Sequence, residues 1–330
     1  MILLGSYPFF FFFMFFLCCL FSVCSTTIKI VDQTGKGDYF SIQQAIDDVP
    51  IGNPKHVLIL INPGIYFEKI VVPPNKPFIT LTATKPGTTI ISWNNHRDIF
   101  ESPTLTVLAS DFIGRFLTIQ NNYGPGAKAV ALRVSADRVA FFGCKIKAHQ
   151  DTLLDDAGRH YYKNCYIEGD TDSFVEMQSV FERCHLHSVS EVGGAITAQH
   201  RISEEEETGF LFVGCNISGT KSAILGRPWG AYSRVVFAKT YMSSVILPQG
   251  WDDWGDSSKQ RTVYYGEYKN YGPGARSYDR VEWSHNLTTK EAKEYLTLNI
   301  IGGRSWIKSA NIHYKKISVI ISNHVNPIIP

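Results

Sequence analysis

The chain has 330 residues, of which 44% are hydrophobic, 13% aromatic and 19% charged. This apolar content supplies a large core and excludes a disordered chain or a coiled coil. The formal net charge of +2, from 32 Lys and Arg against 30 Asp and Glu, gives no indication of the strongly basic surface that nucleic-acid-binding proteins present.

The N-terminal segment is predicted to be a secretory signal peptide. Residues 8–23 are apolar without a break, no charged residue precedes Lys29, and Ser22-Val23-Cys24 is a small-x-small cleavage site. We therefore expect residues 1–24 to be removed and the mature protein to be secreted. An uncleaved anchor and a buried strand are the alternatives, but this apolar run is longer than an ordinary strand.

Two short helices are predicted near the ends of the folded chain. Residues 41–48 place apolar side chains four positions apart after Ser41, a favourable N-cap, and such a helix is suited to closing one end of a solenoid. Residues 288–295 are the second candidate. The tail, residues 307–330, is β-prone but shows no repeat, and its structure is not predicted.

Between these helices the chain repeats with a period of about 20 residues. Four blocks read aromatic-x-x-Cys-x-aliphatic, and related blocks without cysteine cover residues 112–119 and 235–242. A short period on β-prone runs is typical of a parallel β-helix, whereas helical solenoids need longer repeats. Successive cysteines are 21, 19 and 31 residues apart, and a polar insertion with four glutamates, residues 204–207, explains the long step. We predict one all-β domain over residues 27–306.

Cysteines and sequons are consistent with secretion. Three of the seven cysteines lie in the predicted signal peptide, and the other four are Cys144, Cys165, Cys184 and Cys215. These four either form up to two disulfides or serve as small buried residues. Asn216 and Asn286 begin Asn-x-Ser/Thr sequons and are candidate glycosylation sites.

The coil length brings polar residues from distant parts of the sequence together. Residues one coil apart in a parallel β-helix stack at about 4.8 Å. Lys128, the pair Gln150-Asp151, and Asp172 follow one another at intervals of one coil, so the two aspartates are expected to be neighbours. Two carboxyl groups this close cannot both ionise cheaply, and such a pair can supply an acid and a nucleophile or base. Aspartates that only cap turns are the alternative.

Ordered motifs identify a family. The sequence contains GIYFE at 64–68, AVAL at 129–132, QDTL at 150–153, LGRPW at 225–229 and PQGW at 248–251. In this order and spacing, over about 280 residues, they resemble the signature motifs of plant pectin methylesterases. The resemblance implies a right-handed parallel β-helix and the form of the family that lacks an inhibitor-like pro-region.

The resemblance also implies an activity, the demethylation of homogalacturonan in the plant cell wall with release of methanol and without a metal or organic cofactor. By motif, Asp172 is the nucleophile, Asp151 the general acid that becomes the base, and Gln150 an oxyanion donor. Arg227 is implied to bind Asp172 and keep it ionised. Two tryptophans, Trp229 and Trp251, are expected to line the groove as sugar platforms, with burial in the core as the alternative.

Four features depart from the family pattern or flank it. Lys128 stands where the family usually has glutamine, and a cation there favours ionised Asp151 and weakens it as an acid. Residues 172–176 read DSFVE instead of DFIFG, and Ile99 lies near a substrate-contacting threonine of the family. His149, beside the QDTL motif, is expected to form a wall of the groove.

Two other functions are compatible with these residues. One is a catalytically weak homologue that only binds pectin, which the changes at Lys128 and 172–176 motivate. The other is a different β-helix polysaccharide enzyme that uses Asp155-Asp156 or Asp170 with Asp172 as calcium ligands or as a hydrolytic pair. A serine esterase is disfavoured because no GxSxG motif occurs. We expect a monomer whose partners are homogalacturonan and a proteinaceous pectinesterase inhibitor, without nucleic acid or membrane.

Overall fold

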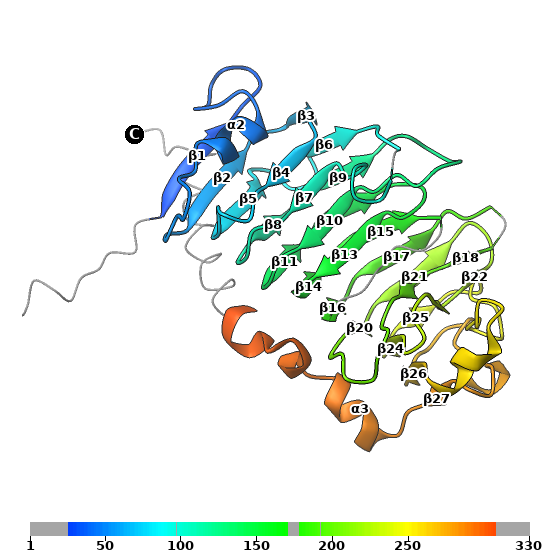
Figure 1. Ribbon diagram of the computed structural model, residues 1–330. Helices are drawn as coiled ribbons and strands as arrows, with labels where there is room; N and C mark the ends of the chain where they lie inside the picture. Colours follow the sequence, from blue (N-terminus) through cyan, green and yellow to red (C-terminus); the bar gives the residue numbers. More distant parts are fainter. Residues whose placement is uncertain (1–25, 97, 171–177, 192, 308–330) are drawn as a thin grey trace, which may run out of the picture.

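The computed structural model describes residues 26–96, 98–170, 178–191 and 193–307. The predicted signal peptide, Asp172 and the tail beyond residue 307 lie outside these ranges. The described chain winds into a right-handed parallel β-helix, with short strands stacked coil on coil from β1 at one end to β27 at the other (Figure 1). In this part of the chain, no helix is long and apolar enough to cross a membrane.

Three parallel sheets form the walls of the described solenoid. The first has eleven strands, in spatial order β1 (Thr27–Val31), β2 (Val57–Ile61), β5 (Ile79–Ala83), β8 (Ile113–Arg115), β11 (Val139–Phe142), β14 (Arg159–Lys163), β16 (Gln178–Glu182), β20 (Gly209–Val213), β24 (Arg234–Ala238), β26 (Tyr264–Tyr268) and β27 (His285–Asn286). The second has eight strands, β3 (Gly64–Phe67), β6 (Thr89–Trp93), β9 (Thr118–Asn121), β12 (Lys145–Lys147), β15 (Tyr166–Gly169), β17 (His185–Ser188), β21 (Asn216–Gly219) and β25 (Tyr241–Met242).

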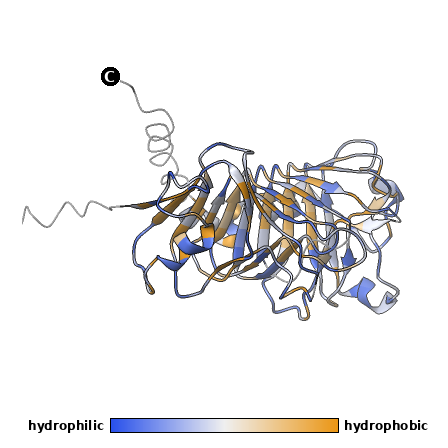
Figure 2. Ribbon diagram, turned by 90° about the horizontal axis from the view of Figure 1, so that it is seen from above, coloured by the Kyte–Doolittle hydropathy of each residue, from blue (hydrophilic) through white to orange (hydrophobic). Residues whose placement is uncertain are grey.

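The third wall is shorter and interrupted. Its four-stranded part contains β4 (Ile70–Val72), β7 (Leu105–Val107), β10 (Leu132–Ser135) and β13 (Leu153–Ala157). Two pairs continue it, β18 (Gly194–Ala195) with β22 (Ala223–Ile224) and β19 (Ala198–Gln199) with β23 (Arg227–Pro228). Hydrophobic residues run along the stacked strands, as Figure 2 shows, because alternate side chains of each strand point into the solenoid.

The repeated blocks occupy equivalent positions on consecutive coils, as predicted. Phe141 pairs with Tyr162, Tyr162 with Phe181, Phe181 with Phe212, and Phe212 with Phe237. Their buried rings stack with centroids 4.4 to 5.5 Å apart. The four cysteines follow these rings in the same register and are buried free thiols. The insertion at residues 204–207 is a largely exposed loop, also as predicted.

Both predicted helices are present. Helix α2 (Ile42–Asp47) has Ser41 as its N-cap and buries its apolar side against the first coils. Glu68, the last residue of the GIYFE motif, accepts hydrogen bonds from the backbone N–H groups of Ile42 and Gln43, so this motif fastens the N-terminal plug. Helix α3 (Thr289–Tyr295) begins with a capping box between Thr288 and Glu291.

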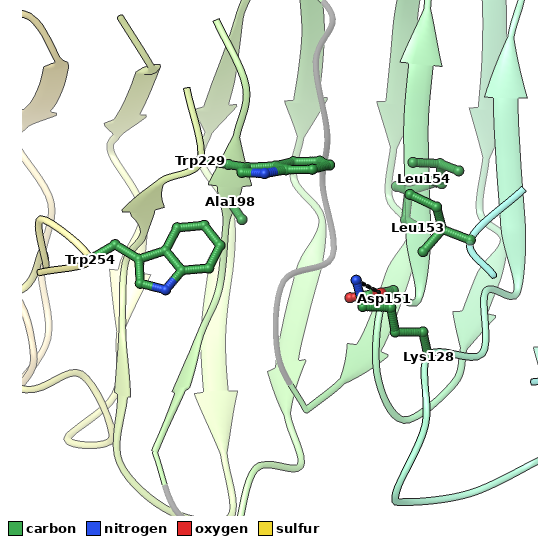
Figure 3. Close-up of a pocket in the computed structure, with 8 residues that line it drawn as sticks. Lys128, Asp151, Leu153, Leu154, Ala198, Trp229 and Trp254 are labelled. Carbon is green, nitrogen blue, oxygen red and sulfur yellow. Dashed lines mark ion pairs between the residues drawn. The ribbon is translucent and has the colours of Figure 1, made fainter. Parts of the chain in front are cut away.

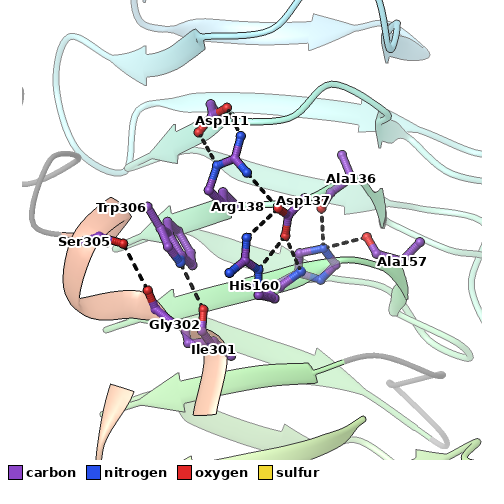
Figure 4. A network of polar contacts seen from close by, with 11 residues as sticks. Asp111, Ala136, Asp137, Arg138, Ala157, His160, Ile301, Gly302, Ser305 and Trp306 are labelled. Atoms are coloured by element: carbon purple, nitrogen blue, oxygen red, sulfur yellow. Dashed lines mark hydrogen bonds and ion pairs between the residues drawn. The ribbon is translucent and has the colours of Figure 1, made fainter. Parts of the chain in front are cut away.

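Short 3-10 helices complete the C-terminal region, η1 (Ser257–Arg261), η2 (Ser277–Asp279) and η3 (Leu298–Ile301). After α3 the chain turns back along the outer face of the eleven-stranded sheet, where Ile301 and Ile307 are buried against it. Trp306 donates a hydrogen bond to the carbonyl of Ile301, and Figure 4 shows both beside the Asp111–Arg138–Asp137 ion pairs. This segment therefore packs against strands from the middle of the solenoid.

A buried ion pair closes the turn between β13 and β14. His160 and Asp155 are fully buried, with Nδ1 of the imidazole 2.6 Å from the carboxylate. The second ring nitrogen lies 2.8 and 2.9 Å from the carbonyl oxygens of Ala136 and Ala157 (Figure 4). Because both nitrogens face oxygen acceptors, both carry protons and the imidazole is charged. The carboxylate also accepts hydrogen bonds from two hydroxyls, those of Tyr162 and Ser179.

The stability of the fold is expected to fall at alkaline pH because of this pair. Burial alone lowers the pKa of His160, but the Asp155 charge and the hydrogen bonds to both ring nitrogens outweigh it and raise the pKa. The imidazolium thus contributes stability that is fully present below about pH 6.5, the usual histidine pKa, and lost as pH rises through the raised pKa. Urea unfolding midpoints measured across this range test it. A constant midpoint would contradict a buried imidazolium.

Candidate active site

A pocket of about 120 Å³ opens at the third wall of the solenoid. It is lined by Ile99, Lys128, Asp151, Leu153, Leu154, Ala198, Trp229 and Trp254. Figure 3 shows Asp151, Lys128 and the two leucines on one side, with Ala198 and the two tryptophans facing them. The pocket thus joins a polar, charged side to an aromatic side.

Asp151 is held by the in-register stacking of two motifs. The backbone of Lys128 forms a parallel β-bridge with the backbone of Gln150 on the next coil. The backbone N–H groups of Ala129 and Ala131 donate to the carbonyls of Gln150 and Thr152 at 3.1 and 3.0 Å. AVAL and QDTL are therefore neighbours in space, as coil spacing predicted. Asp151 itself has φ of 60°, the left-handed conformation that residues other than glycine adopt mainly at turns and functional sites.

Lys128 is the charged neighbour of Asp151. Its Nζ lies 4.0 Å from Oδ2 of Asp151, which is an ion-pair distance but too long for a direct hydrogen bond. The lysine side chain is 59% exposed, while that of Asp151 is 16% exposed. The cation is therefore loosely held beside a well-fixed carboxylate.

The aromatic side of the pocket carries Trp229 and Trp254, which are 40% and 43% exposed. The ring of Trp229 packs against His200 at 4.8 Å between centroids. Trp254 has φ of 56° in a tight turn, where its backbone N–H donates to the Asp252 carboxylate. The guanidinium carbon of Arg227 lies 4.3 Å from the Trp254 ring centroid, so this arginine packs on the face of the Trp254 ring.

The prediction that Trp251 lines the groove is wrong. Its side chain is only 1% exposed, stacks on Tyr265 at 4.3 Å and donates its indole N–H to Glu267. A ring buried in this way cannot contact a sugar, so core packing, the alternative reading, is the correct one. Trp254 takes the groove position that was assigned to Trp251. The signal for it was present, since Trp254 lies in a DDWG stretch typical of an exposed turn.

The remaining predicted residues lie around the pocket or outside the described chain. Asp172 and the rest of the 172–176 segment lie outside the described residues. Ile99 lines the pocket, whereas Gln150 and Arg227 adjoin lining residues without lining it themselves. His149 stands 3.5 Å from Asp170, measured from Nδ1 to Oδ2, on the neighbouring coil.

The calcium alternative does not fit Asp155 and Asp156. Asp155 is buried with His160, and Asp156 binds Arg133 at 2.6 Å, so the two carboxylates serve separate partners. In the part of the chain that the structure describes, no group of three or more His, Cys, Asp or Glu side chains could hold a metal ion.

Comparison with known proteins places these features in a family. The family model for pectinesterase matches residues 28–304. Putative pectinesterase 11 of Arabidopsis thaliana is 56% identical over 295 residues, 88% of this chain and 84% of that protein. The structure of pectin methylesterase from carrot has a TM-score of 0.83 at 31% identity, over 86% of this chain and 95% of that one. A pectin methylesterase solved in complex with hexasaccharide VII has a TM-score of 0.73 at 25% identity, over 84% and 98%.

These matches span nearly all of the described solenoid and include the pocket. They confirm the family that the ordered motifs indicated, and they disfavour a β-helix lyase or glycosidase. The chain belongs to the pectinesterase family, whose members demethylate pectin.

Proposed function

We propose that this pectinesterase hydrolyses the methyl esters of homogalacturonan with Asp151 and Asp172 as its catalytic pair. The observation that carries the assignment is the place of Asp151, a carboxylate fixed in a left-handed turn on one side of the pocket, opposite two exposed tryptophans. Asp172 follows it by 21 residues, the length of one coil, which supports its role as the second carboxylate.

The proposed reaction has two steps. The Asp172 carboxylate attacks the ester carbonyl, and the methoxy oxygen leaves as methanol with the proton of Asp151. Water then attacks the acyl-enzyme and gives one proton to Asp151, and Asp172 leaves as a carboxylate. The released galacturonic acid loses its remaining proton to solvent. Gln150 donates to the oxyanion in both steps. Arg227 acts as the cationic partner of Asp172.

Trp229 and Trp254 are the proposed sugar platforms. Their exposed indole faces lie across the pocket from Asp151, and aromatic faces of this kind pack against the apolar sides of sugar rings (Figure 3). The hexasaccharide complex of a relative supports an extended chain as the ligand, because several sugar units then contact the groove together.

The enzyme is proposed to act in the cell wall after secretion. The apolar segment at residues 8–23 supports cleavage near Cys24. Asn216 in β21 and Asn286 in β27 are both exposed, which supports glycosylation at either sequon. The mature protein is proposed to be a monomer, with a proteinaceous pectinesterase inhibitor as its protein partner.

Methanol release from methyl-esterified homogalacturonan tests the proposed function. We expect the purified mature chain to release methanol without producing new reducing ends, because only ester bonds are cleaved. Lys128 beside Asp151 favours the second candidate, a weak homologue that binds pectin. Binding to pectin without methanol release would support that candidate and overturn the first.

A further inference from the structure

We propose that His185 and His187 form a chelating site for a late first-row divalent metal ion, Cu²⁺ above all, on the outer face of the eight-stranded sheet. Both histidines belong to β17, whereas the pocket opens at the third wall, so this inference is independent of the proposed function. The ion is an exchangeable ligand of this outer face and has no role in the proposed ester hydrolysis.

Strand β17 places both imidazoles on the same side of the sheet. Leu186 points into the core, so the residues before and after it, His185 and His187, both point outward. The strands β15 and β21 flank β17 (Figure 1), and both histidines are half-buried. The rigid strand therefore fixes the distance between the two side chains, as a chelating pair requires.

One ring nitrogen of each histidine approaches the same point. Nε2 of His185 and Nδ1 of His187 each lie 2.7 Å from Oγ of Ser218, in the neighbouring strand β21. The hydroxyl has a single proton, so it donates to at most one of the two nitrogens. Bonds from a metal ion to imidazole nitrogen are about 2.0–2.1 Å long, so an ion beside this hydroxyl reaches both nitrogens after small side-chain rotations.

The surroundings of the pair favour the state that binds metal. The ring of Tyr166 packs edge to face on His185, with centroids 5.1 Å apart, and lies 6.1 Å from the ring of His187. Burial, and secondly the charge of His187 when protonated, lower the pKa of His185. Because only a neutral imidazole binds a metal ion, the lowered pKa keeps His185 available as a ligand at a lower pH than an ordinary histidine.

The ligand set selects the metal. Glu168 is the neighbour of His187 in β15. Its carboxylate already accepts a hydrogen bond from Tyr166 and pairs with Lys147 at 3.1 Å, and no third His, Cys, Asp or Glu ligand completes the site among the described residues. Two imidazoles, with water at the other positions, are expected to bind Cu²⁺ more tightly than Ni²⁺ or Zn²⁺, by the general order of first-row metals. Ca²⁺ and Mg²⁺ prefer oxygen ligands and are not expected to compete.

Titration of the purified mature protein with Cu²⁺, in a buffer that does not bind copper, is the first test. His185→Gln and His187→Gln are each expected to weaken binding at this site by at least about tenfold, a loss of about 1.4 kcal/mol or more. The double variant should lose less than the sum of the two, because either substitution alone breaks the chelate. His285→Gln, which removes a single exposed histidine of β27, is the matched control and keeps the wild-type affinity.

Pulsed electron paramagnetic resonance of the bound Cu²⁺ identifies its ligands directly and is the second test. Wild type and the control are expected to show coupling to two imidazole rings, and each single variant to one. Equal urea unfolding midpoints without metal show that the variants keep the fold, and if one of them unfolds, the other still reports on the chelate. Wild type that binds no Cu²⁺, or binds it with the affinity and spectrum of His185→Gln, overturns the inference.

Discussion

Asp172→Asn is expected to lower methanol release by at least about 10⁴-fold, as removal of a catalytic nucleophile does in other hydrolases. An amide cannot attack the ester carbonyl, and it also loses the charge-assisted contact proposed with Arg227. Binding to esterified pectin should persist, because Trp229 and Trp254 are unchanged. Methanol release by purified variants, with pectin binding measured in parallel, separates the loss of chemistry from the loss of substrate.

Asp156→Asn is the matched control for this substitution. Asp156 is also an aspartate of the third wall, but it binds Arg133 and does not line the pocket. Its asparagine variant is therefore expected to keep activity within a few-fold of wild type. Activity of Asp172→Asn at the wild-type level would remove Asp172 as the nucleophile, whatever the control shows.

His160→Ala is expected to lower the free energy of unfolding by about 3–5 kcal/mol, the cost of removing one partner from a buried ion pair. The reason is that Asp155, fully buried, would keep only its hydroxyl partners and lose its counter-charge. Urea unfolding at neutral pH measures the change directly. His160 lies in β14, inside the solenoid and away from the pocket, so the substitution is expected to affect stability rather than the site directly.

Tyr162→Phe provides the graded comparison. It removes one hydroxyl from Asp155 but keeps the imidazolium and the aromatic stack, so a smaller loss of about 1–3 kcal/mol is expected. If His160→Ala fails to fold, this variant still reports on the network. A His160→Ala protein as stable as wild type would show that Asp155 and His160 are not charged in the fold.

The solenoid could be predicted because its repeats translate sequence spacing into contact. Each coil touches mainly the coils before and after it, so the Phe-x-x-Cys blocks had to stack once their period was recognised. The same logic placed Lys128 beside Gln150 and Asp151. Residues of the turns and strands that keep the coil period were therefore predictable as neighbours.

Features without that period could not be predicted. The DDWG stretch marks Trp254 as a residue of an exposed turn, but the burial of Trp251 depends on which way its indole points, and the neighbouring residues do not determine that. The Asp155–His160 pair spans a turn between two strands, and neither residue belongs to the repeated sequence pattern. For Asp172 the spacing and the motif still provide the assignment, because it lies outside the described residues.

The C-terminal segment changes how the solenoid comes apart. A stack held only by neighbouring coils can fray from its open end, one coil at a time. Here the chain after β27 returns to the middle of the molecule, where Ile301 and Ile307 are buried on the outer face and Gly302 lies against Arg159 of β14. Unfolding of the last coil therefore also requires residues 298–307 to detach from strands that lie several coils upstream. Under a pulling force, the C-terminal half of the solenoid is expected to unfold as one cooperative unit rather than coil by coil.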